Sequence, residues 1–391
     1  MRASGLLGLS SRRALALAVT VAGVGGAAVA VGSGAGCGTL WRPFLEGTAP
    51  SCSSPGGGQS GCDPSCDPGC DPADLGVDLQ PPEWERIPSS TPAALRAVWG
   101  RADETVVYLG GDGNTLLSWR PGQGVRGEVH PGSPTSNITS ISGDVKSSTI
   151  PVFAAGTGSL LLAWDGRNWF QKAPTTTGED YFSVSYANST VWFVGKPGIG
   201  YYGPTLGPYT AAYIPGAPST FPAAVVPNSD GSSVWIGANE VLFRSYGGNT
   251  LSYSLPSRDR ITGLWGGASI PIAGCDAGAC TCDFGTCINS GPFWYAATEG
   301  GQVLRFDPSG AATAQYKLPL PAPSLTAVYG NTLGEVWVVG RAGTVLRYDG
   351  AQWDSVSVGT TEDLFGVWCA PGSRQPWLVG ANGLILRRRA P

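Results

Sequence analysis

From about residue 80 onward, short apolar runs alternate with turn-forming residues, and one pattern recurs along the chain. Each copy has an aromatic residue within an apolar run, a turn rich in Gly, Asn or Asp, and a second apolar run. The seven copies are VVYLGGDGNTLLSW, PVFAAGTGSLLLAW, TVWFVGKPGIGYY, SVWIGANEVLFR, FWYAATEGGQVLRF, EVWVVGRAGTVLRY and PWLVGANGLILR. Two apolar runs around a tight turn predict a β-hairpin in each copy. The aligned aromatic residues are Tyr108, Phe153, Trp192, Trp235, Trp294, Trp337 and Trp377.

Two further patterns add one strand on each side of the hairpin. Before it come LRAVWG at 95, ITGLWG at 261, LTAVYG at 325 and LFGVWC at 364, so Cys369 takes a position that otherwise holds Gly and is expected to be a buried, free thiol. After the hairpin comes a strand centred on an aromatic residue, which is Trp169, Tyr213, Tyr253, Tyr316 or Trp353. Four antiparallel strands in about forty residues are typical of a propeller blade.

The ends of the repeat region predict how the ring closes. The seventh copy ends with LILRRRAP, one strand short of a full blade, whereas PPEWERI precedes the first copy. Trp84 matches the aromatic residue of the fourth strand, so residues Glu83–Ile87 are expected to complete the last blade. Because stacked blades bury the faces of each other's sheets, a closed ring leaves no blade unprotected. We therefore predict an all-β fold, a seven-bladed β-propeller over residues 77–391.

The repeats resemble those of bacterial extracytoplasmic β-propeller proteins. The resemblance rests on VWVVG at Val336–Gly340 and on GTVLRYDGAQW at Gly343–Trp353, and it covers residues 80–391. It implies a propeller outside the cytoplasm and a binding role. The chain lacks the Gly-His and Trp-Asp pairs of WD40 blades, kelch spacing, and the S-x-D-x-G-x-T-W box of sialidases.

Composition agrees with short strands and adds an export signal. Gly 59, Pro 32 and only 13% charged residues disfavour long solvated helices. Residues 1–36 contain Arg2, Arg12 and Arg13, followed by an uncharged apolar run, which predicts an export signal of the Sec or twin-arginine type. The tripeptide before Cys37 resembles a lipobox, so Cys37 is the expected lipidation site, with simple cleavage after Ala30 or Ala35 as the alternative.

The segment 37–76 consists mainly of Gly, Ser, Pro, Cys and Asp, without apolar periodicity, and is predicted to be a tether. A calcium site at its Asp-Pro repeats is the weaker interpretation, because the Gly and Glu of known calcium loops are missing. A second Cys-rich segment, 268–291, interrupts the fifth repeat with the spacing C-x4-C-x-C-x4-C. Outside the cytoplasm these thiols are expected to form disulfides rather than a zinc site. The disulfide candidates are Cys52, Cys62, Cys66, Cys70, Cys275, Cys280, Cys282 and Cys287.

Charge narrows the range of partners. The chain carries −4, and losing the three arginines of residues 1–36 leaves −7, which argues against nucleic acid and anionic lipid surfaces. Membrane contact is expected only through the lipid anchor or an uncleaved signal. The expected partner is a peptide, a protein or a glycan of the bacterial envelope, and the chain is expected to be a monomer without cofactor or metal.

Ligand-binding candidates come from two groups of residues. Turns between second and third strands, and crossings between blades, share one face of a propeller, where mixed charges could contact a ligand or form an ordinary polar surface. The second group is a cluster of tyrosines in the third repeat, which combine an apolar ring with a polar tip. The candidates are Tyr201, Tyr202, Tyr209, Glu240, Arg258, Asp259, Arg260, Glu299 and Arg341.

No catalytic residues are predicted. His130 is the single histidine and lies in the loop HPGSP, without a nucleophile motif beside it. The favoured function is a non-enzymatic binding or scaffold protein held at the envelope. The alternative is a polysaccharide-active hydrolase or lyase, which would need two carboxylates converging in one deep pocket.

Overall fold

A computed structural model describes most of the repeat region. The described residues are 83–390, except for 145–150, 173–178, 188, 197–198, 205–208, 214–221, 228–232, 247–248, 257, 270–291, 308 and 332–333. The predicted export signal, the lipidation site, the tether and the eight disulfide candidates lie outside these residues. Within the described part of the chain, no helix is both long and apolar enough to cross a membrane.

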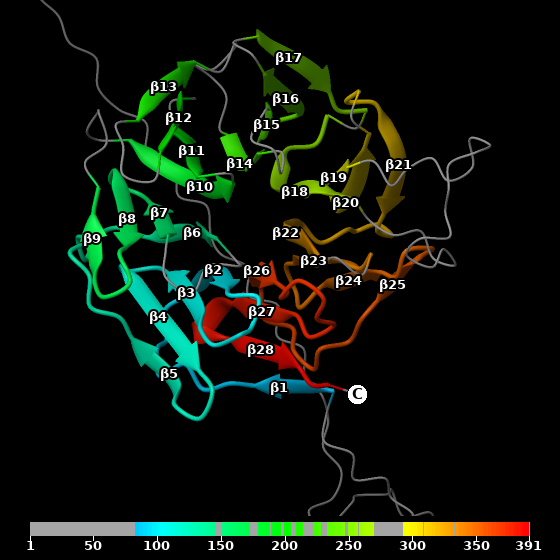
Figure 1. Cartoon of the computed structure of the whole chain (residues 1–391). Coiled ribbons are helices and arrows are strands. Elements are labelled where there is room, and N and C mark those ends of the chain that lie inside the picture. Colours follow the sequence, from blue (N-terminus) through cyan, green and yellow to red (C-terminus); the bar gives the residue numbers. More distant parts are fainter. Residues whose placement is uncertain are drawn as a thin grey trace, which may run out of the picture. The chain divides into compact units, whose positions relative to one another are not determined.

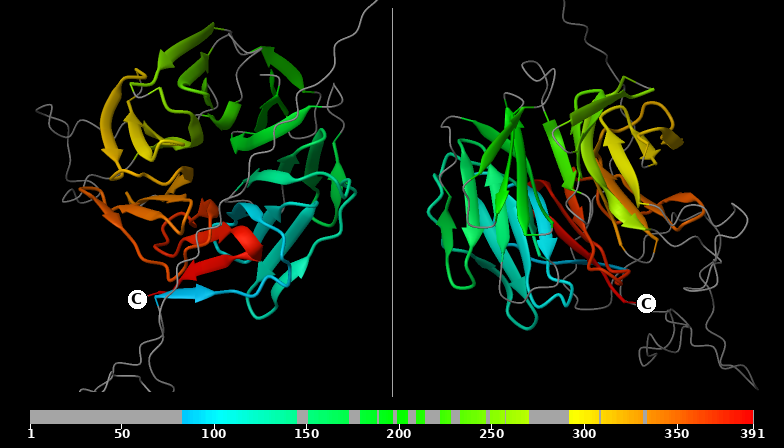
Figure 2. Two further views of the ribbon diagram at one scale, coloured as in Figure 1. Left: turned by 180° about the vertical axis from the view of Figure 1, so that it is seen from behind. Right: turned by 45° about the horizontal axis from the view of Figure 1, so that its top comes forward.

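The structure confirms the predicted fold. Seven separate sheets of four antiparallel strands surround a central channel as a seven-bladed β-propeller (Figure 1). The blades follow one another around the ring in chain order, as the views from behind and from a tilted direction also show (Figure 2). In each blade the first strand lies nearest the channel and the fourth lies at the rim.

Strand bounds follow the repeats. Blades 1 to 3 comprise β2 (Leu95–Gly100), β3 (Val107–Gly111), β4 (Thr115–Arg120) and β5 (Gly124–Gly127); β6 (Ile138–Gly143), β7 (Val152–Gly156), β8 (Leu160–Trp164) and β9 (Trp169–Gln171); and β10 (Asp180–Ala187), β11 (Thr190–Lys196), β12 (Ile199–Pro204) and β13 (Thr210–Tyr213). Blade 4 comprises β14 (Pro222–Pro227), β15 (Ser233–Ala238), β16 (Val241–Tyr246) and β17 (Asn249–Ser254).

The remaining blades keep the same order. Blade 5 comprises β18 (Ile261–Ser269), β19 (Pro292–Thr298), β20 (Gln302–Phe306) and β21 (Ala312–Lys317); blade 6 comprises β22 (Leu325–Gly330), β23 (Val336–Gly340), β24 (Val345–Tyr348) and β25 (Trp353–Ser355). Blade 7 comprises β26 (Leu364–Trp368), β27 (Trp377–Gly380), β28 (Ile385–Arg388) and β1 (Trp84–Arg86), with a short 3-10 turn, Ala381–Gly383, between β27 and β28.

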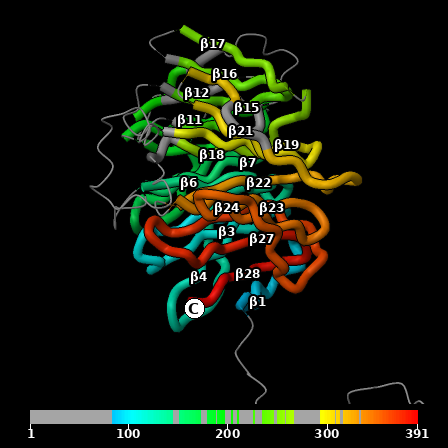
Figure 3. Tube along the Cα trace, turned by 90° about the vertical axis from the view of Figure 1, so that its right-hand side faces the viewer, coloured from blue at the N-terminus to red at the C-terminus, as the bar shows by residue number. Residues whose placement is uncertain are grey.

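The seventh blade combines strands from both ends of the repeat region. Trp84 lies opposite Arg388, and the pairing continues beyond the strands because Ile87 N–H donates to the Ile385 carbonyl at 2.9 Å. Figure 3 shows β1 beside β28 from the side. Trp84 is buried, and its ring meets the ring of Trp337 in blade 6 edge to face at 6.0 Å. The N-terminal strand therefore contributes to the packing between blades 6 and 7.

The aligned aromatic residues of the hairpins pack between blades. In blade 5 the structure assigns a different residue to this position than the sequence alignment does. Trp337 lies opposite Arg347 and Trp377 lies opposite Arg387, but in blade 5 the partner of Arg305 is Tyr295. The alignment of Trp294 with the other aromatic residues was therefore wrong by one position. The sequence alone left this register open, because Phe293, Trp294 and Tyr295 are all aromatic. The strand pairing decides it, since Tyr295 lies opposite Arg305 just as Trp337 and Trp377 lie opposite their arginines.

The innermost strands approach closely enough that only a small residue fits at their ends. A Cβ on Gly100 would lie 2.7 Å from the Trp368 ring of the neighbouring blade, and Gly143 faces Trp99 in the same way. Cys369 occupies the equivalent position in blade 7, where it is 1% exposed, free, and donates its S–H to the Ser373 carbonyl. This confirms the prediction of a buried, free thiol.

Candidate binding site at the channel mouth

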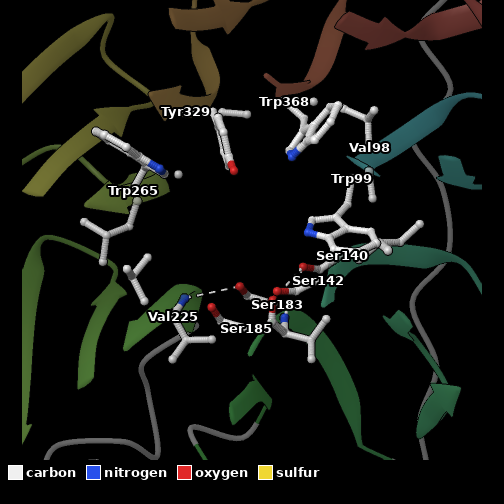
Figure 4. Close-up of a pocket in the computed structure, with 18 of the residues that line it drawn as sticks. Val98, Trp99, Ser140, Ser142, Ser183, Ser185, Val225, Trp265, Tyr329 and Trp368 are labelled. Carbon is white, nitrogen blue, oxygen red and sulfur yellow. Dashed lines mark hydrogen bonds between the residues drawn. The ribbon is translucent and has the colours of Figure 1, made fainter. Parts of the chain in front are cut away.

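The first strands of the blades enclose a cavity of about 420 Å³ along the ring axis, with two different walls. One wall carries the aromatic side chains Trp99, Trp265, Tyr329 and Trp368, and the facing wall carries the hydroxyl groups of Ser140, Ser142, Ser183 and Ser185 (Figure 4). The aromatic wall belongs to blades 5, 6, 7 and 1, and the serine wall belongs to blades 2 and 3.

The serines join neighbouring first strands. The Ser140 and Ser142 hydroxyl oxygens accept the backbone N–H groups of Val184 and Tyr186, both at 3.1 Å. Ser183 accepts the N–H of Val225 at 3.2 Å, which Figure 4 shows as a dashed line. These bonds satisfy backbone groups at the seams between blades, which supports a structural role for this wall.

A threonine near the start of the first strand has a similar role in three blades. The hydroxyl of Thr139 lies 3.1 Å from the Ala155 carbonyl of its own blade and 2.7 Å from the Tyr181 carbonyl of the next blade. Thr262 repeats this geometry at 3.0 and 2.8 Å, and Thr326 at 3.1 and 2.6 Å. At this position, threonine therefore connects one blade to the next.

Three blades have bulky residues at this same position: Arg96 in blade 1, Phe182 in blade 3 and Phe365 in blade 7. All three line a second cavity, of about 400 Å³, at this end of the channel. Its other lining residues include Arg260, Glu299 and Arg341 from the connecting loops. We refer to these six residues as the channel mouth. Since none of the three bulky residues can repeat the threonine bonds, their presence at the mouth suggests a role other than packing.

Arg96 is held in place from two sides. Its Nη2 donates to Asp112 Oδ2 at 2.7 Å and its Nε donates to Oδ1, while its guanidinium lies 5.2 Å from the centre of the Phe365 ring. Asp112 raises the pKa of Arg96 through these hydrogen bonds, although partial burial acts in the opposite direction. A guanidinium has five N–H groups, and Asp112 engages two of them. The remaining groups of this fixed, half-exposed side chain can contact a ligand.

The loop residues of the mouth lie next to one another around its edge. Glu299 N–H donates to the Arg260 carbonyl at 2.9 Å, so these two exposed residues are neighbours. Arg341 Nη1 donates to Asp363 Oδ2 at 3.3 Å, and its side chain is 62% exposed. Asp363 also accepts the N–H of Ala342 at 2.9 Å, which fixes the turn that carries Arg341. Three arginines and one glutamate thus line the mouth.

The structure brings together only some of the residues predicted from the sequence. Arg260, Glu299 and Arg341 line the mouth, whereas Glu240 and Arg258 are exposed outside both channel cavities. Asp259, in the crossing between blades 4 and 5, accepts a hydrogen bond from Gln302 Nε2 of blade 5. These three residues do not join the mouth.

The tyrosine candidates of blade 3 lie elsewhere. Tyr209 is 8% exposed, packs edge to face on Phe193 at 5.2 Å, and has its pKa raised to about 12 by burial. These contacts support a packing role. Tyr201 and Tyr202 belong to β12, and their side chains lie outside the described part of the structure.

His130 supports its own loop. Its Nδ1 accepts the N–H of Gly132 at 3.3 Å, so its Nε2–H donates to the Asn114 carbonyl at 3.0 Å. Burial lowers the pKa of His130. Among the described residues, no group of three His, Cys, Asp or Glu side chains could hold a metal ion.

Sequence reasoning missed Arg96, Phe182 and Phe365 at the mouth. A position-by-position comparison of the first strands could have found them, because threonine recurs at this position in LTAVYG and ITGLWG but arginine and phenylalanine replace it in LRAVWG and LFGVWC.

No family model and no curated protein matches the sequence, but solved structures share its fold. Virginiamycin B lyase from Staphylococcus aureus superimposes with a TM-score of 0.63 at 11% identity, covering 78% of this chain and 98% of that chain. The structure of YCF48 bound to D1 peptide gives 0.60 at 15% identity, covering 80% and 99%. The WD40 propeller domain of Doa1 gives 0.60 at 11% identity, covering 78% and 94%. At these identities the likeness shows the propeller fold alone.

Proposed function

We propose that this protein is a non-enzymatic binding protein that recognises a carboxylate-bearing peptide segment at the channel mouth. The observation that carries the proposal is the replacement of the blade-joining threonine by Arg96, Phe182 and Phe365 at one cavity. Guanidinium groups bind carboxylates through paired, charge-assisted hydrogen bonds. The two phenylalanine rings add apolar surface for the side chains around that carboxylate.

The arrangement of charge supports an anionic ligand. Three guanidinium groups from blades 1, 5 and 6 surround the cavity, and Glu299 is the one carboxylate among its described lining residues. Asp112 and Asp363 hold Arg96 and Arg341 in position, so less conformational entropy is lost when a ligand binds. The whole chain is acidic, which makes this cationic mouth a local exception.

A peptide fits better than a neutral sugar at this mouth. Aromatic residues can bind either, but three arginines favour a ligand with carboxylates, such as the acidic side chains or the C-terminus of a polypeptide. YCF48, a propeller of similar fold, is described with a bound D1 peptide. The alternative function, polysaccharide cleavage, needs two converging carboxylates, and the described residues at the mouth supply Glu299 alone beside the ion-paired aspartates.

Peptide titrations test the proposal. The mature protein is titrated by calorimetry with peptides that end in Asp-Glu residues and a free carboxylate, and with the same peptides amidated and changed to Asn and Gln. The acidic peptides are expected to bind at least tenfold more tightly. Arg341→Gln should weaken binding, whereas Arg126→Gln, an equal charge change at an exposed residue of the outer strand β5, should not. Equal binding of acidic and amide peptides would refute the proposal.

We also propose that the protein works outside the cytoplasm, held at the bacterial envelope by a lipid on Cys37. The support is the sequence of residues 1–36 and the lipobox-like tripeptide before Cys37. A tether such as residues 37–76 would place the propeller at a distance from the membrane.

A further inference from the structure

A third cavity lies between blades 5 and 6, away from the channel. Its volume is about 250 Å³, and its lining residues are Tyr295, Val303, Arg305, Tyr316, Tyr348, Ala351 and Trp353. It shares no lining residue with the two channel cavities. We refer to it as the interblade cavity. Because four of its seven lining residues are aromatic and one is an arginine, it differs from an ordinary packing gap.

Between blades 7 and 1, larger side chains fill the equivalent place. There, Trp377 and Trp119 pack at 4.8 Å between ring centres, with the Arg387 guanidinium 5.1 Å and 5.2 Å from the two rings. Glu104 accepts a 2.5 Å hydrogen bond from Arg387 and holds it there. In register, Tyr295 corresponds to Trp377, Arg305 to Arg387, and Tyr348 to Trp119.

Two smaller rings therefore replace two tryptophans at this interface. Tyr295 and Tyr348 are 6.3 Å apart, compared with 4.8 Å for the tryptophan pair. A tryptophan in place of Tyr348, as at Trp119 in blade 1, would fill the interblade cavity. The space is thus a property of these two residues and not of the blade geometry.

The walls of the cavity combine flat apolar faces with hydrogen-bonding groups. Trp353 lies 5.2 Å from Tyr348, 5.7 Å from Tyr316 and 6.3 Å from Tyr295, measured between ring centres. The Tyr348 hydroxyl donates to the Gly350 carbonyl at 2.8 Å, which fixes that ring. The Arg305 guanidinium lies 4.6 Å from the centre of the Phe293 ring. Tyr295 is 3% exposed, burial raises its pKa to about 12, and its hydroxyl shares a hydrogen bond with the side chain of Arg305.

We propose that the interblade cavity binds one carboxylated pyranose ring of an acidic glycan. Aromatic rings pack against the C–H face of a sugar, and tyrosine hydroxyls exchange hydrogen bonds with its hydroxyl groups. Arg305 supplies the group that pairs with a carboxylate. A volume of about 250 Å³ is below the usual range for drug-sized ligands and suits a single ring. A quaternary ammonium, the other usual guest of an aromatic cage, is disfavoured by the positive charge of Arg305.

The test uses the full mature chain and three soluble probes: glucuronate, galacturonate and glucose. Binding is followed by saturation-transfer NMR and by quenching of tryptophan fluorescence, since Trp353 lines the cavity. A uronate is expected to bind at least tenfold more tightly than glucose. Arg305→Gln should remove that preference while leaving weak binding of both sugars.

Tyr348→Trp provides the sharpest variant, because it installs the residue found at the filled interface. It should abolish uronate binding without lowering the melting temperature. If the added ring is not tolerated, Ala351→Trp, at an exposed residue of the rim, should block entry without touching the core. The proposal is overturned if no uronate binds, if glucose binds equally well, or if both variants still bind uronate.

This inference is independent of the proposed function. Arg341→Gln at the channel mouth should leave uronate binding unchanged, and Tyr348→Trp should leave binding of acidic peptides unchanged. Failure of one proposal therefore does not remove support from the other.

Discussion

The guanidinium of Arg96 in blade 1 lies 5.2 Å from the centre of the Phe365 ring in blade 7. Both residues occupy the position at which three other blades carry threonine, and Asp112 holds the arginine from the other side. At this position, a cation–π interaction between Arg96 and Phe365 thus takes the place of the hydrogen bond that joins neighbouring blades elsewhere. The cation–π contact also leaves N–H groups of Arg96 available to a ligand. A substitution at this position can therefore change ligand affinity without changing the stability of the fold.

Arg96→Thr should convert the mouth into the structural form of the repeat. By analogy with Thr139, the new hydroxyl would reach the carbonyl oxygens of Gly110 and Ile138. The hydrogen bond contributes about 1 kcal/mol, and the half-exposed ion pair with Asp112 that is lost is worth about 0–1 kcal/mol. The free energy of unfolding should therefore change little, while affinity for acidic peptides falls at least tenfold. Urea denaturation and calorimetry measure the two effects.

A threonine at the same position in blade 5 provides the control for this prediction. Thr262→Val removes a hydroxyl that lies within 3.0 Å of two carbonyl oxygens, and it should destabilise the fold by about 1–3 kcal/mol. Thr262→Ser keeps the hydroxyl and should cost less. If Arg96→Thr unfolds the chain as readily as Thr262→Val, the separation of structure and binding is wrong.

Trp84→Ala tests whether the N-terminal strand stabilises the ring. Trp84 is 8% exposed and contacts Trp337 of blade 6, so its loss leaves a large cavity between blades. Truncation of a buried tryptophan costs about 3–5 kcal/mol. Glu85→Gln, at a half-exposed neighbour on the same strand, should cost about 1 kcal/mol or less. Similar denaturation midpoints for the two variants would show that β1 adds little to stability.

Acidification should destabilise the fold in part through His130. Burial lowers its pKa in the folded chain, so between that folded-state pKa and about 6.5 the unfolded chain binds more protons. The free energy of unfolding therefore rises with pH across this window. The contribution of His130 to stability is lost as the pH falls through the same window. Melting temperatures of the wild type and of His130→Gln, compared from pH 7.5 to pH 5, isolate the effect from that of the carboxylates.

In that comparison the wild type should lose more stability on acidification than the variant. Parallel melting curves across the whole pH range would contradict the prediction.

The cysteines of the chain should differ in their reactivity toward a thiol reagent. Cys369 is 1% exposed and burial raises its pKa to about 12, so a maleimide should not modify it in the folded protein. If Cys37 carries the proposed lipid and the other eight cysteines form the predicted disulfides, the protein isolated from membranes and unfolded without reductant should react only at Cys369. Peptide mapping by mass spectrometry identifies the modified residue. Cys37→Ser should move the protein from the membrane fraction to the soluble fraction.

The sequence predicted the fold well because a propeller repeats one local pattern. A hairpin that occurs seven times restricts the register of every strand, and a misaligned copy is corrected by its neighbours. Blade 5 shows the limit, since Phe293, Trp294 and Tyr295 all fit the aromatic position and only the pairing with Arg305 decides between them.

The candidate sites were less accessible to sequence reasoning. Arg260, Glu299 and Arg341 could be placed on one face because the topology fixes which loops share it. Arg96 and Phe365 lie inside strands that read as ordinary core strands, so their exposure depends on the channel. The interblade cavity depends on the size of Tyr295 and Tyr348 relative to tryptophans in another blade, a difference in packing that no single repeat reveals.

The pairing of β1 with β28 has a consequence for biosynthesis. The ribosome makes the strand that contains Trp84 before any other strand of the ring, yet its partner in the sheet contains Arg388 and is made last. Six blades can assemble as their own strands are synthesised, but the seventh has to wait until β28 has been made. Throughout that interval the first strand needs protection from wrong partners, and a secretion route that accepts only finished folds would handle this chain differently from one that threads it unfolded.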